Sequence, residues 1–423
     1  MLRFASSPTG DMHIGDLRVA LFNYLVSKQR KEDLIVRIED IEKEKVIEGK
    51  DKEILEILEV FGIEYSQLIY QSESIRFHSA MALQLIHDKK AFSCFCSDNW
   101  LENKRKEAED ANSTYLYDDA CKDLHPELVI DNINPFTIRI NRPTSPIVIK
   151  DTIKGDATFE NETLDSFVLL NHNKIPVQTF ASAVDDMLNN ISIVLRDEKF
   201  YSNSPKQEHV REMLNYDKKI VYAHLPSVLD LETVSVKKLL EDGFLPDAIA
   251  NYLISLGNKT PKEIFNLKEA IEWLDFKNLD ASPASFDFDK LKELNRKHLQ
   301  NLDAKELSRY VGFADNSIGN LAKVYLNNVS TTKELREKIA PIFAPKEIAS
   351  EYKEVTNILK EIIKNAPYFE EYKEFKNYLI KESGLDEKTM IHSLSLLLTG
   401  VEDGPEIADI YKYLKDYIGV IVK

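Results

Sequence analysis

Hydrophobic positions in the first 61 residues alternate between short apolar runs and longer stretches with helical spacing. The runs at residues 2–5 and 34–38 have the length and apolar character of buried strands. The stretches at residues 17–29 and 50–61 place their apolar side chains on one face of a helix. Because strands that alternate with helices form parallel sheets, the pattern predicts an α/β domain at the start of the chain.

The pattern changes twice further along the chain. Residues 92–151 are irregular, with cysteines and prolines among short extended runs such as residues 136–140, which indicates an insertion. Apolar runs at residues 166–170 and 191–195 are each long enough for a central strand, so we expect the first domain to be split in sequence. From about residue 234 the spacing is helical almost throughout. The predicted fold is an α/β domain with an inserted α+β subdomain, followed by all-α domains.

The composition excludes several classes of protein. Of the 423 residues, 43% are hydrophobic and 30% are charged, which is typical of globular chains and unlike disordered or fibrous ones. No stretch reaches the roughly 18 uncharged apolar residues of a membrane span, and the N-terminus lacks the apolar region of a signal peptide. We therefore expect a cytoplasmic protein without a membrane partner. The net charge of −16 requires any nucleic-acid surface to be a local basic patch.

The first loop is a candidate nucleotide site. The stretch Ser7-Pro8-Thr9-Gly10 follows the first predicted strand, and His13-Ile14-Gly15 precedes the first predicted helix. Backbone N–H groups at a helix N-terminus favour phosphate charge, so this arrangement suits a nucleotide. The alternative is an ordinary strand-to-helix turn that Asp16 caps.

Several stretches resemble a known family. The longest, from Arg3 through Gly10 to His13-Ile14-Gly15-Asp16, closely resembles the first signature of class I glutamyl-tRNA synthetases, usually written HIGH. That family also has counterparts of residues 37–40 (Arg-Ile-Glu-Asp) and 202–207 (Ser-Asn-Ser-Pro-Lys-Gln), in the same order. Residues 222–226 and 243–253 resemble the segments that flank the family's second signature. The resemblance covers at least residues 2–257.

The resemblance implies a reaction and the residues that serve it. Glutamate attacks the α-phosphate of ATP in line, and the glutamyl group is transferred to tRNA-Glu, tRNA-Gln or both. The implied ligands are ATP, Mg²⁺, glutamate and tRNA, and no DNA is expected. By position in the motifs, the implied substrate-binding residues are Arg3, Ser7, Glu39, Gln178 and Arg196. The implied ATP-binding residues are Pro8, Thr9, Gly10, His13, Gly15 and Leu225, of which His13 and Gly15 are also the catalytic positions.

Two of these residues also have a plainer interpretation. The resemblance implies that Arg196 holds the side-chain carboxylate of glutamate through a bidentate fork. Without the surrounding motifs, Glu39 and Arg196 would suggest a surface ion pair at the ends of two strands. For the attack of glutamate on the α-phosphate of ATP, positioning of the reactants and neutralisation of their charge matter more than proton transfer.

The resemblance also implies a division into domains. Residues 1–90 and 151–233 correspond to a Rossmann-like catalytic domain, and residues 91–150 to an inserted subdomain that binds the acceptor end of tRNA. Residues 234–301 correspond to a helical stem-contact region, and residues 302–423 to an all-α anticodon-binding domain.

Two features of the helical half bear on RNA binding. Basic residues cluster in one predicted helix, and such a face suits either tRNA phosphates or bulk solvent. They are Lys290, Lys292, Arg296, Lys297 and His298. Aromatic residues between positions 368 and 378 could stack on bases, but their helical spacing favours core packing.

The three cysteines suggest a metal site in the insertion. An odd number of cysteines in a long chain is no disulfide framework, whereas closely spaced thiolates suit tetrahedral zinc. Cys94, Cys96 and Cys121 supply three ligands. Tyr117 matches a tyrosine that serves as the fourth ligand in some relatives of the family, and His125 is a second donor nearby. The alternative is three inert thiols without a metal.

The chain departs from the family at the second signature. A Lys-Met-Ser-Lys-Ser-like loop is expected between Leu229 and Ser235, but the residues there are Asp-Leu-Glu-Thr-Val. The missing lysines would stabilise charge on the ATP phosphates. The pocket also differs, with Gln-Thr-Phe at residues 178–180 and Asp-Glu-Lys-Phe at residues 197–200. Two alternatives follow: a paralogue that binds tRNA, glutamate or a protein partner without aminoacylation, and a synthetase for another amino acid.

Overall fold

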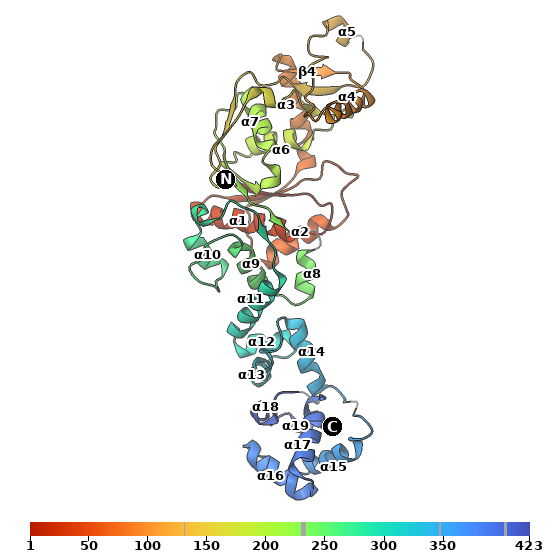
Figure 1. Cartoon of the computed structure of the whole chain (residues 1–423), viewed down its shortest axis with the longest axis vertical. Helices are drawn as coiled ribbons and strands as arrows, with labels where there is room; N and C mark the ends of the chain where they lie inside the picture. Colours follow the sequence, from red (N-terminus) through yellow and green to blue (C-terminus); the bar gives the residue numbers. More distant parts are fainter. Residues whose placement is uncertain (131, 230–233, 347, 402–403) are drawn as a thin grey trace. The chain divides into compact units, whose positions relative to one another are not determined.

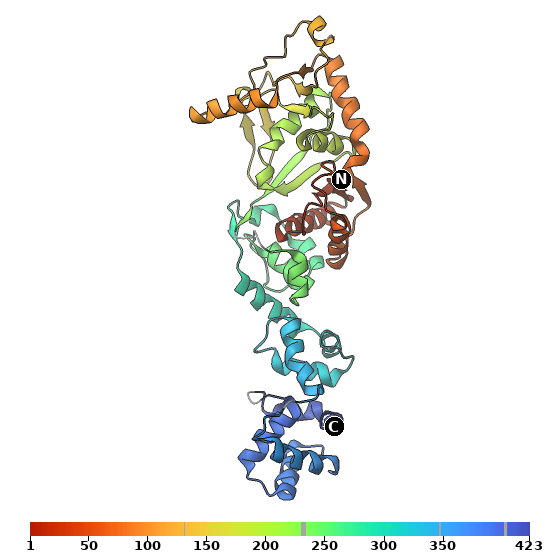
Figure 2. The same cartoon turned by 90° about the vertical axis from the view of Figure 1, so that its right-hand side faces the viewer.

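The chain folds into two compact units, which Figures 1 and 2 show in two views. The first unit comprises Met1–Lys237 and Leu253–Phe286, and the second comprises Lys238–Tyr252 and Asp287–Lys423. The structure, a computed structural model, describes residues 1–130, 132–229, 234–346, 348–401 and 404–423.

A five-stranded parallel sheet forms the centre of the first unit (Figure 1). Across the sheet, its strands are β10 (Val221–Leu225), β9 (Ile193–Asp197), β1 (Leu2–Ser6), β2 (Leu34–Ile38) and β3 (Gln67–Tyr70). Every residue of β2 is buried, as expected for a parallel strand that is covered on both faces. The strands expected at residues 2–5, 34–38 and 191–195 are confirmed as β1, β2 and β9.

Helices lie on both sides of this sheet. The helix α1 (Ile14–Arg30) packs on β1, β2 and β9, and α6 (Gln178–Leu188) lies on the opposite side beside α7 (Asn203–Met213) (Figure 1). The helices expected at residues 17–29 and 50–61 are confirmed as α1 and as α2 (Lys50–Val60). This unit also contains η1 (Gln71–Ser74), α3 (Ile75–His87), η2 (Asn161–Thr163), η3 (Glu198–Phe200), α10 (Leu267–Trp273) and η4 (Phe276–Asn278).

The segment between the two halves of the central sheet forms a second, antiparallel sheet. Its strands are β4 (Ala91–Cys94), β5 (Thr137–Ile140) and β8 (Val168–Leu170). The expectation that residues 166–170 form a central strand is therefore wrong, since Leu170 pairs with Ile138 of this second sheet. An apolar run that is buried on both faces has the same pattern in either sheet. The segment further includes α4 (Asp98–Asp110), α5 (Pro126–Ile130), β6 (Ile147–Ile149) and β7 (Ala157–Phe159).

The second unit is helical in the part of the chain that the structure describes. Its helices pack around one core of leucine, isoleucine and aromatic side chains. They are α11 (Phe288–Asn301), α12 (Ala304–Tyr310), α13 (Asn316–Tyr325), α14 (Thr332–Phe343), α15 (Lys353–Lys364), α16 (Tyr372–Ser383), α17 (Glu387–Thr399), α18 (Ile407–Leu414) and α19 (Ile418–Ile421). Two helices, α8 (Val236–Glu241) and α9 (Pro246–Ser255), carry residues of both units, and the short strands β11 (Val228–Leu229) and β12 (Ala284–Ser285) pair in the first. The sheet and the helices that follow it confirm the expected fold class.

Two expectations concern RNA binding by the helical half: one for its basic residues and one for its aromatic residues. The basic residues of α11 do not form one open face, because Arg296 donates to the carbonyl oxygen of Val329 and His298 is buried against Asn251. The aromatic residues do belong to the core, as expected: Phe375 is buried, and Phe369, Tyr372 and Tyr378 pack against the same cluster. None of the described helices combines the length and the apolar character needed to cross a membrane.

Gly319 of α13 permits a close approach to α12. A Cβ atom at this position would lie 1.6 Å from the carbonyl oxygen of Ala304, which as a backbone atom cannot move aside without shifting its helix. We expect Gly319→Ala to lower the free energy of unfolding by about 3 kcal/mol or more, the upper end of the cost of overpacking. Thermal unfolding of the purified protein measures this loss.

Gly419→Ala is the matched control for this variant. Gly419 lies in α19, and a Cβ atom there would meet no atom within 4 Å. Alanine should therefore be neutral or should stabilise the protein by up to about 1 kcal/mol. Equal unfolding temperatures for the two variants would contradict the close contact of α12 and α13.

Candidate active site

Three neighbouring parallel strands bring three arginines together. Arg3 of β1, Arg37 of β2 and Arg196 of β9 are 3%, 1% and 8% exposed. Arg37 and Arg196 are each the last residue but one of their strands, near the carboxyl edge at which open α/β sheets bind ligands, whereas Arg3 is the second residue of β1. A buried charge is costly unless it is paired, so the partners of these three guanidinium groups determine what the site can do.

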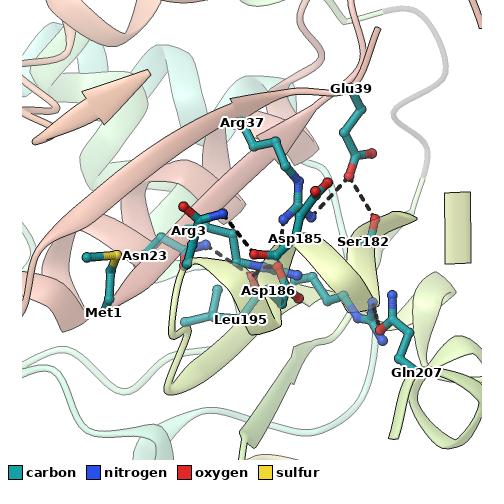
Figure 3. A network of polar contacts seen from close by, with 12 residues as sticks. Met1, Arg3, Asn23, Arg37, Glu39, Ser182, Asp185, Asp186, Leu195 and Gln207 are labelled. Carbon is teal, nitrogen blue, oxygen red and sulfur yellow. Dashed lines mark hydrogen bonds and ion pairs between the residues drawn. The ribbon is translucent and has the colours of Figure 1, made fainter. Parts of the chain in front are cut away.

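Asp186 of α6 neutralises two of the arginines (Figure 3). Its carboxylate lies 2.6 Å from Nη1 of Arg37 and 3.2 Å from Nε of Arg3. Burial alone would raise the pKa of Asp186, but the charges of Arg3 and Arg37 outweigh it and lower that pKa to about 2. The same contacts raise the pKa of Arg37 against the effect of burial. Asp186 and Arg37 are therefore both charged at neutral pH.

The network continues from Arg37 to Glu39, which lies just beyond the end of β2 (Figure 3). Nη2 of Arg37 is 3.2 Å from Oε1 of Glu39. Gln178 donates to Oε2 of Glu39 at 2.6 Å, and the Ser182 hydroxyl donates to Oε1 at 3.2 Å. Three donors from two elements thus fix the carboxylate of Glu39 in one orientation.

Asp185, the neighbour of Asp186, connects α6 to η1 and α3. Its carboxylate accepts a hydrogen bond of 2.8 Å from Gln71 and lies 2.7 Å from Nε2 of His78. Both partners are buried. These contacts fix the helix that carries Gln178, Ser182 and Asp186 into the site.

Arg196 differs from the other two arginines because its partners are uncharged. It donates to Oε1 of Gln207 at 3.0 Å, to Oγ of Ser204 at 2.8 Å and to Nε2 of His224 at 3.1 Å. Burial lowers the pKa of Arg196 to about 10, so the group remains charged at neutral pH. A surface ion pair of Arg196 with Glu39 is therefore ruled out, since Arg196 is buried with neutral hydrogen-bond partners and Glu39 pairs with Arg37.

A cavity of about 240 Å³ opens between these groups. It is smaller than the roughly 300–1,000 Å³ of sites for drug-sized molecules, so it suits a small polar ligand. Six residues that the sequence implicates line it: Arg3, Ser7, Thr9, Glu39, Gln178 and Arg196. The lining also includes Ser6, Asp16, Ser182, Lys199 and Gln207.

The other implicated residues lie around the N-terminus of α1 and at the end of β10. His13 is the N-cap of α1, and its Nδ1 accepts a hydrogen bond of 3.3 Å from the backbone N–H of Gly15. Asp16, the alternative cap, lines the cavity instead, and burial raises its pKa. Pro8 and Gly10 belong to the loop before the helix, and Leu225 is 1% exposed. The side chain of Leu225 is therefore not open to a ligand, and Leu225 does not line the cavity.

Sequence reasoning missed Asp186 and Ser182, which hold the arginines and Glu39 in place. One signal was available: Asp185 and Asp186 interrupt the apolar run at residues 180–188, where a buried face is expected. Carboxylates in such a run indicate buried cations elsewhere in the fold. The sequence pattern does not show which cations these are.

Three thiols and one phenol meet in the inserted segment. The sulfur atoms of Cys94, Cys96 and Cys121 all lie within 4.8 Å of one another, and those of Cys96 and Cys121 are 3.6 Å apart. The hydroxyl of Tyr117 lies 3.4 Å from the sulfur atoms of Cys94 and of Cys96. His125 is exposed and faces Glu127 instead. Burial, together with the neighbouring thiols, raises the pKa of Cys96 to about 12.

The sequence matches one family model over most of its length. Residues 1–293 match the model described as tRNA synthetases class I (E and Q), catalytic domain. This chain belongs to that family. The resemblance of its motifs to class I synthetases is thereby confirmed, and the cavity of this synthetase lies within the matched region.

Curated proteins resemble the synthetase over its whole length. A protein of Sulfurimonas denitrificans named glutamate–tRNA ligase 2 is 59% identical, and one of Nitratiruptor sp. named glutamate–tRNA ligase 1 is 46% identical, each over 100% of both chains. The first alignment is 432 positions long, so at least nine positions have no counterpart among the 423 residues. A crystal structure of a glutamate tRNA ligase from Elizabethkingia meningosepticum, in complex with its amino acid, shares the fold with a TM-score of 0.81 and 23% identity, over 100% of this chain and 98% of that chain.

Replacement of Asp186 tests the charge network of the synthetase. Asp186→Asn removes the shared carboxylate and leaves two buried guanidinium groups without it, so we expect the free energy of unfolding to fall by about 3–5 kcal/mol. Because the pKa of Asp186 is lowered to about 2, its contribution in the wild type is present above about pH 4 and is lost as the pH falls towards 2. Chemical unfolding at neutral pH measures the difference.

Glu64→Gln is a control with the same chemical change. Glu64 pairs with Lys28 at 2.6 Å, but its side chain is 76% exposed. The loss of an exposed ion pair costs at most about 1 kcal/mol. If Asp186→Asn cost no more than this control, the two arginines would not depend on Asp186.

Proposed function

We propose that this chain is a glutamate–tRNA ligase, which activates glutamate with ATP and transfers the glutamyl group to tRNA. One observation carries the proposal: Arg196, a buried guanidinium whose bonded partners are all uncharged, lines a small polar cavity. A ligand carboxylate would complete the ion pair that Arg196 lacks among the described residues. The 59% identity to a protein named glutamate–tRNA ligase 2 supports the choice of glutamate.

Each end of glutamate has a complementary group in the cavity. Arg196 would pair with the side-chain carboxylate, for which a guanidinium fork is suited. The carboxylate of Glu39 would accept hydrogen bonds from the ammonium group of glutamate. Arg3, Ser7 and Gln178 would line the remaining surface of the cavity. Since Glu39 is already oriented by Arg37 and two neutral donors, little side-chain ordering remains to be done on binding.

ATP would lie beside glutamate at the N-terminus of α1. The residues proposed for this role are Pro8, Thr9, Gly10, His13, Gly15 and Leu225. An oxygen of the α-carboxylate of glutamate would attack the α-phosphorus, and the bond to the β-phosphate would break with release of pyrophosphate. Mg²⁺, which is held chiefly by the phosphates, would neutralise part of their charge. The helix N-terminus and the cap at His13 favour the same negative charge.

The rest of the chain would serve the tRNA. In this proposal, the inserted segment at residues 91–150 meets the acceptor end, residues 234–301 meet the stem, and residues 302–423 meet the anticodon of tRNA-Glu, tRNA-Gln or both. Because ATP and tRNA are substrates of translation, the reaction would take place in the cytoplasm.

A second candidate function is favoured by the missing lysine loop. The residues at positions 230–233, where the second signature should be, lie outside the described part of the chain. The alignment with the Sulfurimonas denitrificans relative has more positions than this chain has residues, which agrees with residues that this chain lacks at one or more points. Without those lysines, the protein would bind tRNA, glutamate or a protein partner and would not aminoacylate. The next two lysines in the sequence, Lys237 and Lys238, belong to the helix α8 and not to a loop.

The proposed reaction predicts glutamate-dependent exchange of pyrophosphate into ATP. We expect the purified chain to exchange, and we expect a Lys-Met-Ser-Lys-Ser loop inserted between Leu229 and Ser235 to raise the rate at least about 10²–10³-fold, because each lost charge contact costs a factor of that order. Arg196→Ala should abolish the glutamate-dependent exchange, both in the chain as it is and in the variant with the inserted loop. Exchange is measured with and without added tRNA-Glu and tRNA-Gln, and transfer of labelled glutamate to one or both of these tRNAs identifies the acceptor.

The exchange assay separates the alternatives. Exchange by the loop-bearing variant alone would favour the impaired paralogue over an active enzyme. Exchange with an amino acid other than glutamate would favour a synthetase with a changed substrate. Gln178 and Lys199 are the pocket residues that differ from the family's pattern. The absence of exchange from both forms, with every amino acid tested, would overturn the proposed function.

We also propose that the thiol cluster binds one structural zinc ion. In a tetrahedral site with zinc–sulfur bonds of about 2.3 Å, the sulfur atoms lie about 3.8 Å apart, close to the 3.6 Å between Cys96 and Cys121. Tyr117 would be the fourth ligand. The guanidinium of Arg139 lies 3.9 Å from the centre of the Tyr117 ring and would offset the negative charge of three thiolates. The alternative remains three thiols without a metal.

Elemental analysis tests the zinc site. Protein purified without chelator should contain about one zinc ion per chain, and Cys121→Ser should lower this content several-fold because it removes one of three thiolates. His125→Ala should retain the metal, since its side chain faces Glu127 and not the thiols. A metal-free wild type would contradict the site, and loss of zinc from His125→Ala would assign the fourth ligand to the histidine.

A further inference from the structure

A chain of buried hydrogen bonds lies behind the cavity. It starts at Asp151, passes through His224 and ends at the guanidinium of Arg196. Nδ1 of His224 is 2.5 Å from Oδ2 of Asp151, and Nε2 of His224 is 3.1 Å from Nε of Arg196. The side chains of His224 and Asp151 are 0% exposed. Neither residue lines the cavity, so neither touches a ligand there.

The donors and acceptors of this chain determine the proton on His224. A guanidinium has only N–H donors, so Nε2 of His224 must accept and carries no proton. Nδ1 then carries the proton and donates it to the carboxylate of Asp151. Asp151 is itself held by the backbone N–H groups of Ile153 and Lys154, each at 2.8 Å. One tautomer of neutral His224 therefore satisfies every contact.

We propose that Asp151 and His224 are positioning residues that hold Arg196 without neutralising it, so that its charge is available to the carboxylate of the substrate. The inference rests on the proposed role of Arg196 in glutamate binding. A carboxylate in place of His224 would also orient Arg196, but it would compete with the ligand for the same charge. A neutral imidazole orients the guanidinium and leaves the ion pair to be completed by the substrate.

The same residues could be taken for a catalytic triad, because Oγ of Ser204 lies 3.1 Å from Nε2 of His224. Two observations argue against a nucleophilic serine. Ser204 is 0% exposed, so no substrate reaches its oxygen. That oxygen also accepts a hydrogen bond of 2.8 Å from Nη2 of Arg196. Ser204 is thus a second neutral acceptor for Arg196.

Protonation of His224 would undo this arrangement. It would place a proton on Nε2, and two positive groups would then face each other across 3.1 Å. Burial lowers the pKa of His224, and the charge of Arg196 acts in the same direction, while Asp151 opposes both. The other groups that face the ring are Arg3, Tyr201 at its edge and Tyr222 stacked on it. Glutamate affinity should therefore be constant around neutral pH and should fall at acid pH.

Two substitutions of His224 separate positioning from simple packing. His224→Leu removes the acceptor, and we expect glutamate binding to weaken about 10- to 100-fold, as for the loss of a hydrogen bond to a charged group. His224→Gln provides a neutral oxygen that does not titrate, so it should recover most of that loss. The dissociation constant of glutamate is measured by calorimetry at about pH 7.5 and about pH 5, with unfolding temperatures as the control for folding.

The comparison of the two substitutions is the decisive result. We expect His224→Gln to bind glutamate more tightly than His224→Leu at about pH 7.5, and we expect any fall in affinity at about pH 5, where the side chain of glutamate is still charged, to be no larger in His224→Gln than in the wild type. No recovery by His224→Gln over His224→Leu, or a larger fall in His224→Gln than in the wild type, would overturn the positioning role. A wild-type protein that binds no glutamate at about pH 7.5 would instead overturn the proposed function.

Discussion

The buried carboxylate of Asp186 is the interaction on which the site depends. Two buried arginines lie on β1 and β2, and neither strand carries an acid that could neutralise both. Asp186 comes from α6 and lies within 3.2 Å of each. The pairing therefore joins two strands and one helix. Among the charged residues that line the cavity, Glu39 and Arg196 are the ones proposed for the two ends of glutamate.

The contrast between the arginines shows how one type of side chain serves two purposes. Arg37 is paired with two carboxylates and is 1% exposed, so its charge is used within the protein. Arg196 is bonded to an amide, a hydroxyl and an imidazole. Each of these acceptors orients the guanidinium but leaves its net charge in place. Such a group favours an anionic ligand because the ligand removes the cost of the unpaired buried charge.

The sequence predicts the elements better than their arrangement. Periodicity places β1, β2, α1 and α2 because their apolar positions repeat over many residues. It does not tell which sheet receives residues 166–170, since both sheets bury an apolar strand on each face. The cavity-lining residues Arg3, Glu39 and Arg196 are identified through motifs. Asp186 lies in none of these motifs, and the motif at residues 222–226 does not show what His224 does, because both roles arise from contacts between segments that are 183 and 28 residues apart in sequence.

The order of the strands has a consequence for the newly made chain. β1 is synthesised first but lies between β2 and β9, and Arg3 meets Asp186 only after 183 further residues. At about 5–20 residues per second, ribosomes need roughly 10–40 s for such a stretch. During that time the strands of the second sheet, β4, β5 and β8, are all translated. The inserted segment is thus complete before the site is, and the nascent chain carries two arginines whose shared counter-charge has not yet been translated.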